Sequence, residues 1–570
     1  MDAYFLRKID IVSKLREINY KREWMYMIKY LEKNKLYVIV KLIISIFFAT
    51  TITIDRIFVY SKNIFAGIDK NYLTNIELKD ICIGIVVFFC SYIAISLIEI
   101  IVNKIEDIVY VKEERREKNI KVFFVFFIII LICWLPYILS FFPGGVYSDT
   151  ATTLNQLQGK EKFNCHQPIG YAFILKIFVN IGTYQLGLKL LTVVQVLAMA
   201  GICSYFVYWM YKKGIISSYL IITIAFFGIY PLIPLYAVSI WKDTPYCIIL
   251  FAFIIYIAEI VYRDGKNLEN TNGIILYELL SFLIAFLRNN GIYILIGTLI
   301  FICIAYKKDI LKTLKKFLII SIAEILIIML IQGPVFNKLE LNEDKFTESV
   351  GSLLQQMAYV VVNNGNLNEE QIEFINKVCP IEKIKKIYSP CLVDSIKWNE
   401  DYDVKFVENN KKEFIKIWFE VFMQNPKMYA KAYILNTIGY WDINRSSDVA
   451  YTNPTMWYGL PFKQYDYLQK LTNISIKNVL CNIKTVSSAI FLFIMLIGVL
   501  MTIYRKKYKN LLIYLPGIFT WLTIMLASPI AFSLRYVYIL VMMVPLSIIT
   551  PFLKNYNEKK ASSEKLNAIL

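Results

Sequence analysis

The chain has 570 residues, of which 57% are hydrophobic, with a mean hydropathy of +0.51 and a formal net charge of +18. This composition excludes a soluble globular protein, because apolar runs of about 20 residues, long enough to cross a bilayer, recur along the chain. The basic residues lie in short clusters between these runs, so they indicate topology and contact with anionic lipid, and no nucleic-acid partner is expected. We therefore predict an all-α polytopic membrane protein.

The first spans set the orientation. Residues 1–35 mix lysine and arginine with aromatic side chains, a pattern typical of an amphipathic segment on the cytoplasmic membrane surface or of a plain positive-inside anchor. Spans are predicted over 36–54 and 81–102, and the basic stretch 104–121 after them is placed in the cytoplasm. The third span, 122–142, therefore delivers the next loop to the extracytoplasmic side.

That loop, 143–167, combines side chains suited to chemistry. It carries Asp149 and ends near His166, the only histidine of the chain. A carboxylate, hydroxyl groups and an imidazole at a membrane surface can perform acid–base steps. The apolar stretch 168–180 is too short to span, and only one crossing fits before the basic residues at Lys212. We therefore predict a re-entrant or surface-lying helix there, which keeps His166 near Asp149.

Nine further spans complete the membrane part, six before and three after a long polar segment. Segment 332–485 is charged and aromatic, lacks an apolar run of spanning length, and is long enough to fold as a domain. The prediction is about twelve spans, nine in 36–331 and three in 486–553, with an α-rich extracytoplasmic domain before the last three. Both termini, including the tail 554–570, are then cytoplasmic. The nine spans are 185–211, 217–236, 244–262, 273–287, 291–306, 317–331, 486–504, 511–527 and 536–553.

Two of the ten cysteines lie in the polar segment beside prolines. They are Cys379, which precedes Pro380, and Cys391, which follows Pro390. If the segment is exported, one alternative is a loop-closing disulfide between them, and the other is a pair of unbridged thiols.

Short outer connections bring further polar residues to the face that carries Asp149. Ionisable groups near the membrane plane are costly and usually face a cavity or a partner, although each alone could be an interfacial side chain that reaches water. Two aspartates, one histidine, one lysine and two arginines on one face suit a phosphate-bearing lipid substrate and an acid–base step. Beyond Asp149 and His166, the residues are Lys242, Asp243, Arg288, Asn289, Arg535 and Tyr536.

These motifs resemble the GT-C superfamily of polytopic glycosyltransferases, which use polyprenyl-phosphate-linked sugar donors. Protein O-mannosyltransferases and lipid A aminoarabinose transferases are examples. The resemblance covers about residues 120–550, but the first loop lacks a clear Asp-x-Asp and the polar segment is unfamiliar, which leaves metal use and the acceptor open. Six motifs are also similar to those of an uncharacterised bacterial family grouped with these enzymes. They are Gly-Gly-Val-Tyr-Ser-Asp149-Thr, His166-Gln-Pro, Trp241-Lys-Asp243, Leu287-Arg-Asn-Asn-Gly291, Gln355-Gln356 and Trp441-Asp442.

The resemblance implies transfer of a sugar from a polyprenyl-phosphate carrier to an extracytoplasmic acceptor, which is a cell-envelope glycan, lipid or protein. Asp149 would act as base in an inverting displacement, while His166 binds the phosphate or orients Asp149. Asp243, with Asp149, could hold Mg²⁺ or Mn²⁺, the only cofactor considered. Arg288, Arg535 and Lys242 would stabilise the phosphate leaving group. The remaining substrate-binding residues would be Tyr147, Ser148, Thr150, Gln167, Asn289, Gln356 and Tyr536.

Three other classes of protein remain alternatives. A transporter would also have many spans, with its polar residues near the bilayer midplane on broken helices and often in internal repeats. Here the spans are nearly free of charge, with Glu259 and Glu324 as the main exceptions, and no repeat is evident. A polysaccharide polymerase or ligase would share lipid-linked substrates and differ in its products. A scaffold for cell-wall assembly would not need Asp149.

Overall fold

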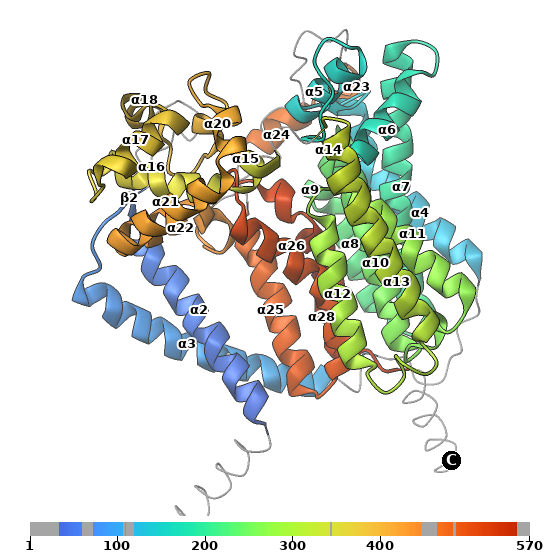
Figure 1. The fold of residues 1–570 in the computed structure, drawn as a ribbon. Helices are drawn as coiled ribbons and strands as arrows, with labels where there is room; N and C mark the ends of the chain where they lie inside the picture. Colours follow the sequence, from blue (N-terminus) through green and yellow to red (C-terminus); the bar gives the residue numbers. More distant parts are fainter. Residues whose placement is uncertain are drawn as a thin grey trace, which may run out of the picture.

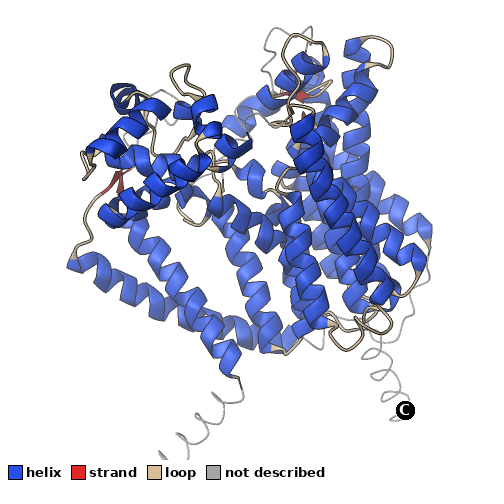
Figure 2. Ribbon diagram, in the orientation of Figure 1, coloured by secondary structure: helices blue, strands red, loops and turns tan. Residues whose placement is uncertain are grey.

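The computed structural model describes residues 34–59, 72–105, 109, 119–341, 345–445, 464–482 and 486–555. Helices dominate this part of the chain, and its strands form only two short pairs (Figure 2). Strand β1 (Phe58–Val59) pairs antiparallel with β2 (Tyr72–Leu73), and β3 (Gly145–Val146) pairs parallel with β4 (Ser239–Ile240). The predicted amphipathic segment 1–35 and the tail 554–570 lie almost wholly outside the described residues.

Seven helical stretches within the described residues are long and apolar enough to cross a membrane. The predicted all-α membrane architecture is therefore confirmed, while the number of twelve spans stays a prediction. The seven are α2 (Lys35–Ile57), α3 (Leu78–Ile105), α4 (Ile120–Ser140), α7 (Tyr184–Lys212), α10 (Asp243–Tyr262), Lys315–Lys338 and Tyr508–Leu526. Shorter apolar helices are α6 (Ile169–Val179), α8 (Ser217–Ile229), α11 (Thr271–Leu287), α12 (Gly291–Ala305), α16 (Gly351–Val362) and α25 (Ser488–Tyr504).

Burial separates central helices from those on the outside of the bundle. In the most apolar 18-residue stretch of α10, 72% of the residues are buried, and the helix packs against α7 and α11. In the corresponding stretch of α3, whose mean hydropathy is 2.7, only 6% are buried, and Phe89 is 58% exposed. An apolar helix with an exposed apolar surface is stable only where that surface meets lipid, so α3 lies at the membrane-facing periphery (Figure 1).

Prolines interrupt two predicted spans. The continuous helix expected over 217–236 is wrong: α8 ends before Tyr230 and Pro231, and a short buried helix α9 (Leu232–Ala237) follows. Proline has no amide hydrogen and clashes with the preceding turn, so a helix usually ends or kinks there. The predicted span 536–553 is divided into short helices, and the last two have proline in the first turn. They are η5 (Leu534–Val537), α27 (Ile539–Met542), α28 (Val544–Ile549) and η6 (Thr550–Phe552).

The apolar stretch 168–180 forms α6, whose 11 residues extend over only about 16 Å. It is too short to cross a bilayer, as the sequence indicated. The helix packs against α7 and α11. A side chain at Gly170 would meet the carbonyl oxygen of Phe286 at 2.6 Å, so this glycine allows α6 to contact the end of α11 closely.

We call residues 332–485 the inserted segment, and its described residues form short helices with a buried core. Its central contact joins α16 to α22 (Pro426–Thr437), with buried residues such as Leu354 and Leu435. Cys379 and Cys391 are buried and do not form a disulfide. The other helices are α14 (Phe336–Lys338), α15 (Lys345–Ser349), α17 (Glu369–Val378), α18 (Ile381–Ile387), α19 (Asp394–Lys397), α20 (Val404–Asn409), α21 (Lys411–Gln424), α23 (Tyr467–Thr472) and α24 (Ile476–Asn482).

The inserted segment is joined by hydrogen bonds to the loop after α26 (Leu515–Leu526). The amide of Val393 donates to the carbonyl of Pro529, and the amide of Ala531 donates to that of Cys391, both at 2.9 Å. Leu392 and Ile530 form an isolated antiparallel bridge. The inserted segment therefore lies at the end of the bundle that also carries α5 (Ser148–Leu157) (Figure 1).

Candidate functional site

The parallel pairing of β3 with β4 assembles the centre of the site. Gly145 is in register with Ser239 and Val146 with Ile240. The residues that follow the two strands therefore lie side by side, which brings the Asp149 region beside Trp241. Tyr147 stacks on the Trp241 indole with ring centroids 4.1 Å apart and an interplanar angle of 7°. Tight backbone pairing, rather than a long sheet, joins these two distant loops.

Two features hold this strand pair in place. Gly144 has a φ of +124°, and a side chain there would meet Thr192 Oγ1 at 2.5 Å, so the position requires glycine. Gln195 on α7 donates through Nε2 to the carbonyls of Ala237 and Ser239, both at 2.8 Å. A buried amide that bonds two backbone oxygens fixes the loop before Trp241.

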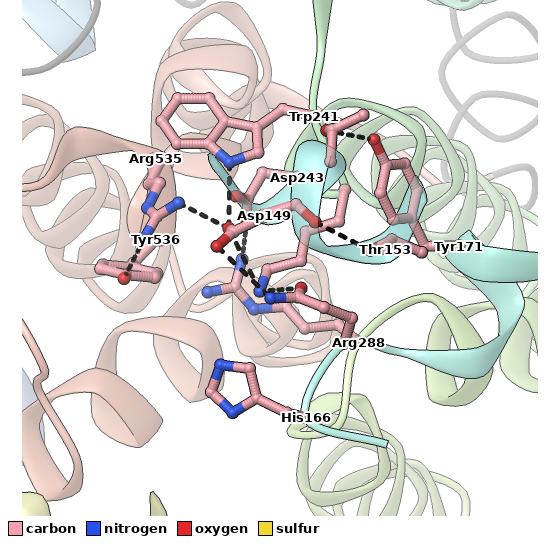
Figure 3. Close-up of polar contacts among 12 residues, drawn as sticks. Asp149, Thr153, His166, Tyr171, Trp241, Asp243, Arg288, Arg535 and Tyr536 are labelled. Atoms are coloured by element: carbon pink, nitrogen blue, oxygen red, sulfur yellow. Dashed lines mark hydrogen bonds and ion pairs between the residues drawn. The ribbon is translucent and has the colours of Figure 1, made fainter. Parts of the chain in front are cut away.

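Asp149, in the first turn of α5, is held by positive charge and N–H donors (Figure 3). Its Oδ2 accepts from Arg535 Nη1 at 2.8 Å and from Trp241 Nε1 at 3.1 Å, and lies 3.3 Å from Lys242 Nζ. Gln167 donates to Oδ1 at 3.4 Å and accepts from Lys242 at 2.7 Å. The structure therefore brings three predicted site residues, Lys242, Gln167 and Arg535, together around the carboxylate of Asp149.

The charge balance keeps this carboxylate ionised. Burial alone would raise the pKa of Asp149, but the charges of Lys242 and Arg535 and the Trp241 hydrogen bond outweigh it and hold that pKa well below its ordinary value. The Arg535 guanidinium also lies over the Trp241 ring, 4.5 Å from its centroid, and Nη2 donates to the Tyr536 hydroxyl at 2.5 Å. Two cations with one carboxylate leave local positive charge for an anion.

A second ion pair lies beneath the first. Asp243, in the first turn of α10 and 1% exposed, accepts from Nη1 of Arg288. The guanidinium lies between the rings of Tyr246 and Tyr536, at 5.4 and 5.3 Å. Oδ2 of Asp243 is buried and has no hydrogen-bond partner among the residues that the structure describes. Arg288 is thus neutralised by Asp243, and its predicted role as a direct phosphate ligand is less suited to this geometry than that of Arg535.

The two aspartates do not fit the considered Mg²⁺ or Mn²⁺ ion. Each faces a cationic side chain, whereas such an ion needs several oxygen ligands of its own. Among the described residues, no group of three or more His, Cys, Asp or Glu side chains could hold a metal. The donor set is that of an anion site, and no step below depends on a metal.

His166 faces the inserted segment. Its Nδ1 lies 3.7 Å from Glu348 Oε1, and its ring meets the Trp398 indole edge-on with centroids 5.5 Å apart. No hydrogen bond joins the imidazole to Asp149, and Figure 3 shows it outside that network. The predicted orienting role toward Asp149 therefore does not match the geometry. Asn289 holds the adjacent backbone, since its side-chain amide donates to the carbonyl of Cys165 at 3.1 Å.

Three other predicted substrate contacts have different surroundings. Thr150 is fully buried, donates to the Ile240 carbonyl at 2.6 Å and lies 2.7 Å from the Tyr171 hydroxyl, so it stabilises the strand pair. Gln356 accepts from Trp418 at 2.9 Å within the inserted segment and makes no polar contact with the Asp149 cluster. Ser148 is exposed beside Asp149.

An apolar groove lies on the other side of the Gly144 loop. It has a volume of ≈ 290 Å³ and is lined mainly by α4 and α7. Leu135, Val193 and Leu197 in its wall are 42–49% exposed, so the groove opens on the outer, membrane-facing side of these helices. Lys189 is the one charged residue among those that line it, and its ammonium lies 5.9 Å from the Phe142 ring.

Several site residues were not predicted from the sequence. Trp241 was noticed only as part of the motif with Lys242, and its adjacency to that lysine was the available signal. Glu348, Asp394 and Trp398 come from the inserted segment, more than 180 residues after His166 along the chain. Nothing in the local sequence pattern indicates that they meet His166.

Comparison with known proteins identifies one family. The profile of a family of unknown function, DUF6020, matches residues 160–565, more than half of the chain. No curated protein and no solved structure matches this chain. The matched region includes Lys242, Arg288 and Arg535 and begins after Asp149.

Proposed function

Because the chain belongs to the DUF6020 family, whose function is unknown, its activity must be argued from its site, and we propose that it is a membrane glycosyltransferase. It moves a sugar from a polyprenyl-phosphate-linked donor to an acceptor hydroxyl, in the manner of the GT-C enzymes that its motifs resemble. The proposal includes about twelve spans, cytoplasmic termini and an extracytoplasmic site, as the basic clusters between the spans favour.

One observation carries this proposal: an ionised carboxylate shares its oxygen with Arg535 and Lys242 at the end of membrane helices. Guanidinium and ammonium groups bind phosphate strongly in a partly buried site. The apolar groove between α4 and α7, with Lys189 in its lining, supports a substrate with a hydrocarbon chain and an anionic head group. A soluble sugar nucleotide would need no such groove.

The reaction is a single displacement. The acceptor oxygen forms a bond to the anomeric carbon, its proton passes to Asp149, and the bond between that carbon and the phosphate oxygen breaks. The electron pair leaves with the lipid phosphate, whose charge Arg535 and Lys242 stabilise. Attack opposite the leaving group inverts the anomeric configuration.

Donor binding would also activate the base. In the free protein Arg535 and Lys242 stabilise the ionised form of Asp149 and make it a weak proton acceptor. A donor phosphate competes for the same two cations. As they shift toward the phosphate, the pKa of Asp149 rises toward its ordinary value, and the carboxylate gains basicity when the substrate is present.

The test is sugar transfer by the purified full chain in lipid, with a panel of radiolabelled polyprenyl-phosphate sugars. Asp149→Asn keeps the size of the side chain and removes the base, so transfer should fall at least about 100-fold. Asp309→Asn, an exposed aspartate outside the site, is the matched control and should retain full activity. Equal transfer by wild type and Asp149→Asn would remove Asp149 from the mechanism, and no transfer with any donor would reject the proposed activity.

A further inference from the structure

The inserted segment presents an exposed aromatic ring next to the site. Trp398 follows α19 and is 65% exposed, although burial of an indole usually contributes strongly to stability. The His166 ring supports it through an edge-on contact, with centroids 5.5 Å apart and an interplanar angle of 88°. An exposed tryptophan supported by a neighbouring imidazole offers a flat apolar surface to a ligand.

Two carboxylates accompany this ring: Asp394 bonds the Trp398 side chain, and Glu348 lies 3.7 Å from the His166 imidazole. Glu348 Oε2 lies 2.5 Å from Lys397 Nζ, and Asp394 Oδ1 lies 3.8 Å from the same nitrogen. The Lys397 side chain is 3% exposed, whereas both carboxylates are 29% exposed. The buried lysine therefore orients the two carboxylates, which stay partly accessible to solvent. We call Trp398, Glu348, Asp394, Lys397 and His166 together the Trp398 wall.

His166 and Gln167 join the Trp398 wall to Asp149, because the His166 ring contacts Trp398 and the next residue, Gln167, donates to Asp149 Oδ1 at 3.4 Å. The positive charge of Arg535, which binds Asp149, also acts on Asp394: burial raises the pKa of Asp394, while Lys397 and Arg535 oppose that shift. The backbone bonds of Cys391 and Val393 to the loop before Arg535 fix this spacing. A ligand on the wall can therefore present an atom toward the carboxylate of Asp149.

We propose that the Trp398 wall binds a carbohydrate ring, and that the acceptor of the proposed transfer is therefore a glycan. A pyranose has an apolar C–H face that packs on an indole and equatorial hydroxyls that donate to carboxylates and an imidazole. The wall supplies both kinds of contact. The role of this sugar as acceptor rests on the proposed function. Binding of a sugar to the Trp398 wall does not, because it requires no donor.

The charge of the wall argues against one other ligand, and its backbone pairing argues against a second. A quaternary ammonium would need net negative charge around the aromatic ring. Here Lys397 and the nearby Arg535 balance Glu348 and Asp394. A peptide strand would need unpaired backbone groups at a sheet edge, and both bridges of Leu392 near the wall, with Ser389 and with Ile530, are internal to the chain.

Binding of uncharged trisaccharides of glucose, mannose and N-acetylglucosamine to the full chain in nanodiscs tests the inference. We expect saturation-transfer NMR signals for at least one of them, with affinity reduced about tenfold or more in Trp398→Ala and largely restored in Trp398→Phe. Phe419→Ala removes a ring of the same segment that is 53% exposed and away from the wall, and should bind as wild type does.

Two outcomes would overturn the inference: equal affinity of wild type and Trp398→Ala, or no signal from any trisaccharide. The variant Asp149→Asn separates this inference from the proposed function, because it should lose transfer but bind the trisaccharide normally. If transfer is established, Trp398→Ala should raise KM for the acceptor more than it lowers kcat.

Discussion

Replacing Arg535 by lysine keeps a positive charge beside Asp149 but removes the planar guanidinium. In the structure Nη1 contacts Asp149 and Nη2 contacts the Tyr536 hydroxyl, while the plane covers the ring of Trp241. A lysine ammonium can keep the first of these contacts but replaces the other two only in part. The comparison of Arg535→Lys with Arg535→Gln therefore separates the contribution of the planar guanidinium to the transfer rate from the contribution of its charge.

The size of the effect follows from the interactions that a lysine side chain cannot make. A hydrogen bond to a charged group contributes roughly 1.5–3 kcal/mol, and a partly desolvated cation–π contact about 1–2 kcal/mol. Because lysine recovers part of both, Arg535→Lys should lose about 2–3 kcal/mol of transition-state stabilisation. At about 1.4 kcal/mol per factor of ten, transfer falls about 30- to 150-fold. Arg535→Gln also removes the charge and should lose on the order of 1000-fold or more.

The assay is the initial rate of sugar transfer under limiting donor, with the melting temperature of each variant measured in the same detergent. Arg263→Lys is the control, because Arg263 is 60% exposed and pairs with Glu259 outside the site, and it should stay within about twofold of wild type. Equal rates for Arg535→Lys and wild type would refute the role of the planar guanidinium. Equal loss in both Arg535 variants would show that charge alone contributes nothing.

Two predictions concern stability. Asp243→Asn leaves the buried Arg288 without its counter-charge and should lower the free energy of unfolding by about 3–5 kcal/mol, measured as a lower melting temperature. The double variant with Arg288→Met should recover part of this stability. An unchanged melting temperature in the single variant would contradict the pairing. Burial, together with the charge of Asp55, raises the pKa of Asp442 to about 7, so the folded state binds a proton more tightly than the unfolded state. Stability should therefore fall as pH rises from about 4 to 7, and Asp442→Asn should flatten this slope in thermal melts between pH 5 and 8. An unchanged slope would refute the assignment.

Apolar patterning was enough to predict the membrane class, because hydrophobic runs of bilayer length rarely occur in soluble proteins. It was not enough to predict continuity. The run 217–236 is apolar throughout, yet Pro231 divides it into α8 and α9. Hydropathy measures the solvent that a segment prefers, whereas continuity depends on a single amide hydrogen.

The candidate site was predictable where motif residues are consecutive. Trp241, Lys242 and Asp243 stand together in sequence, and Asp149 reaches them through two strands of two residues each. Such strands are too short for any periodicity, so the sequence offered the residues but not the register. Thr150 illustrates the limit: its neighbour Asp149 faces the site, while its own hydroxyl bonds the Ile240 carbonyl in the interior.

Residues far apart in sequence were the least predictable. Gln356 belongs to a motif that suggested substrate contact, but it bonds Trp418 inside the inserted segment. Trp398 has no motif around it, yet it contacts His166. Core and surface tryptophans have the same local sequence properties, and only tertiary packing distinguishes them.

The ion pair between Asp149 and Arg535 joins residues 386 positions apart in the chain. At a synthesis rate of about 5–20 residues per second, the carboxylate emerges from the ribosome roughly 20–80 seconds before its arginine. During that interval the nascent chain has the proposed base but not the arginine that pairs with it. Under the proposed function, sugar transfer would begin only after the C-terminal helices that carry Arg535 are in place, and a chain interrupted before them would be inactive.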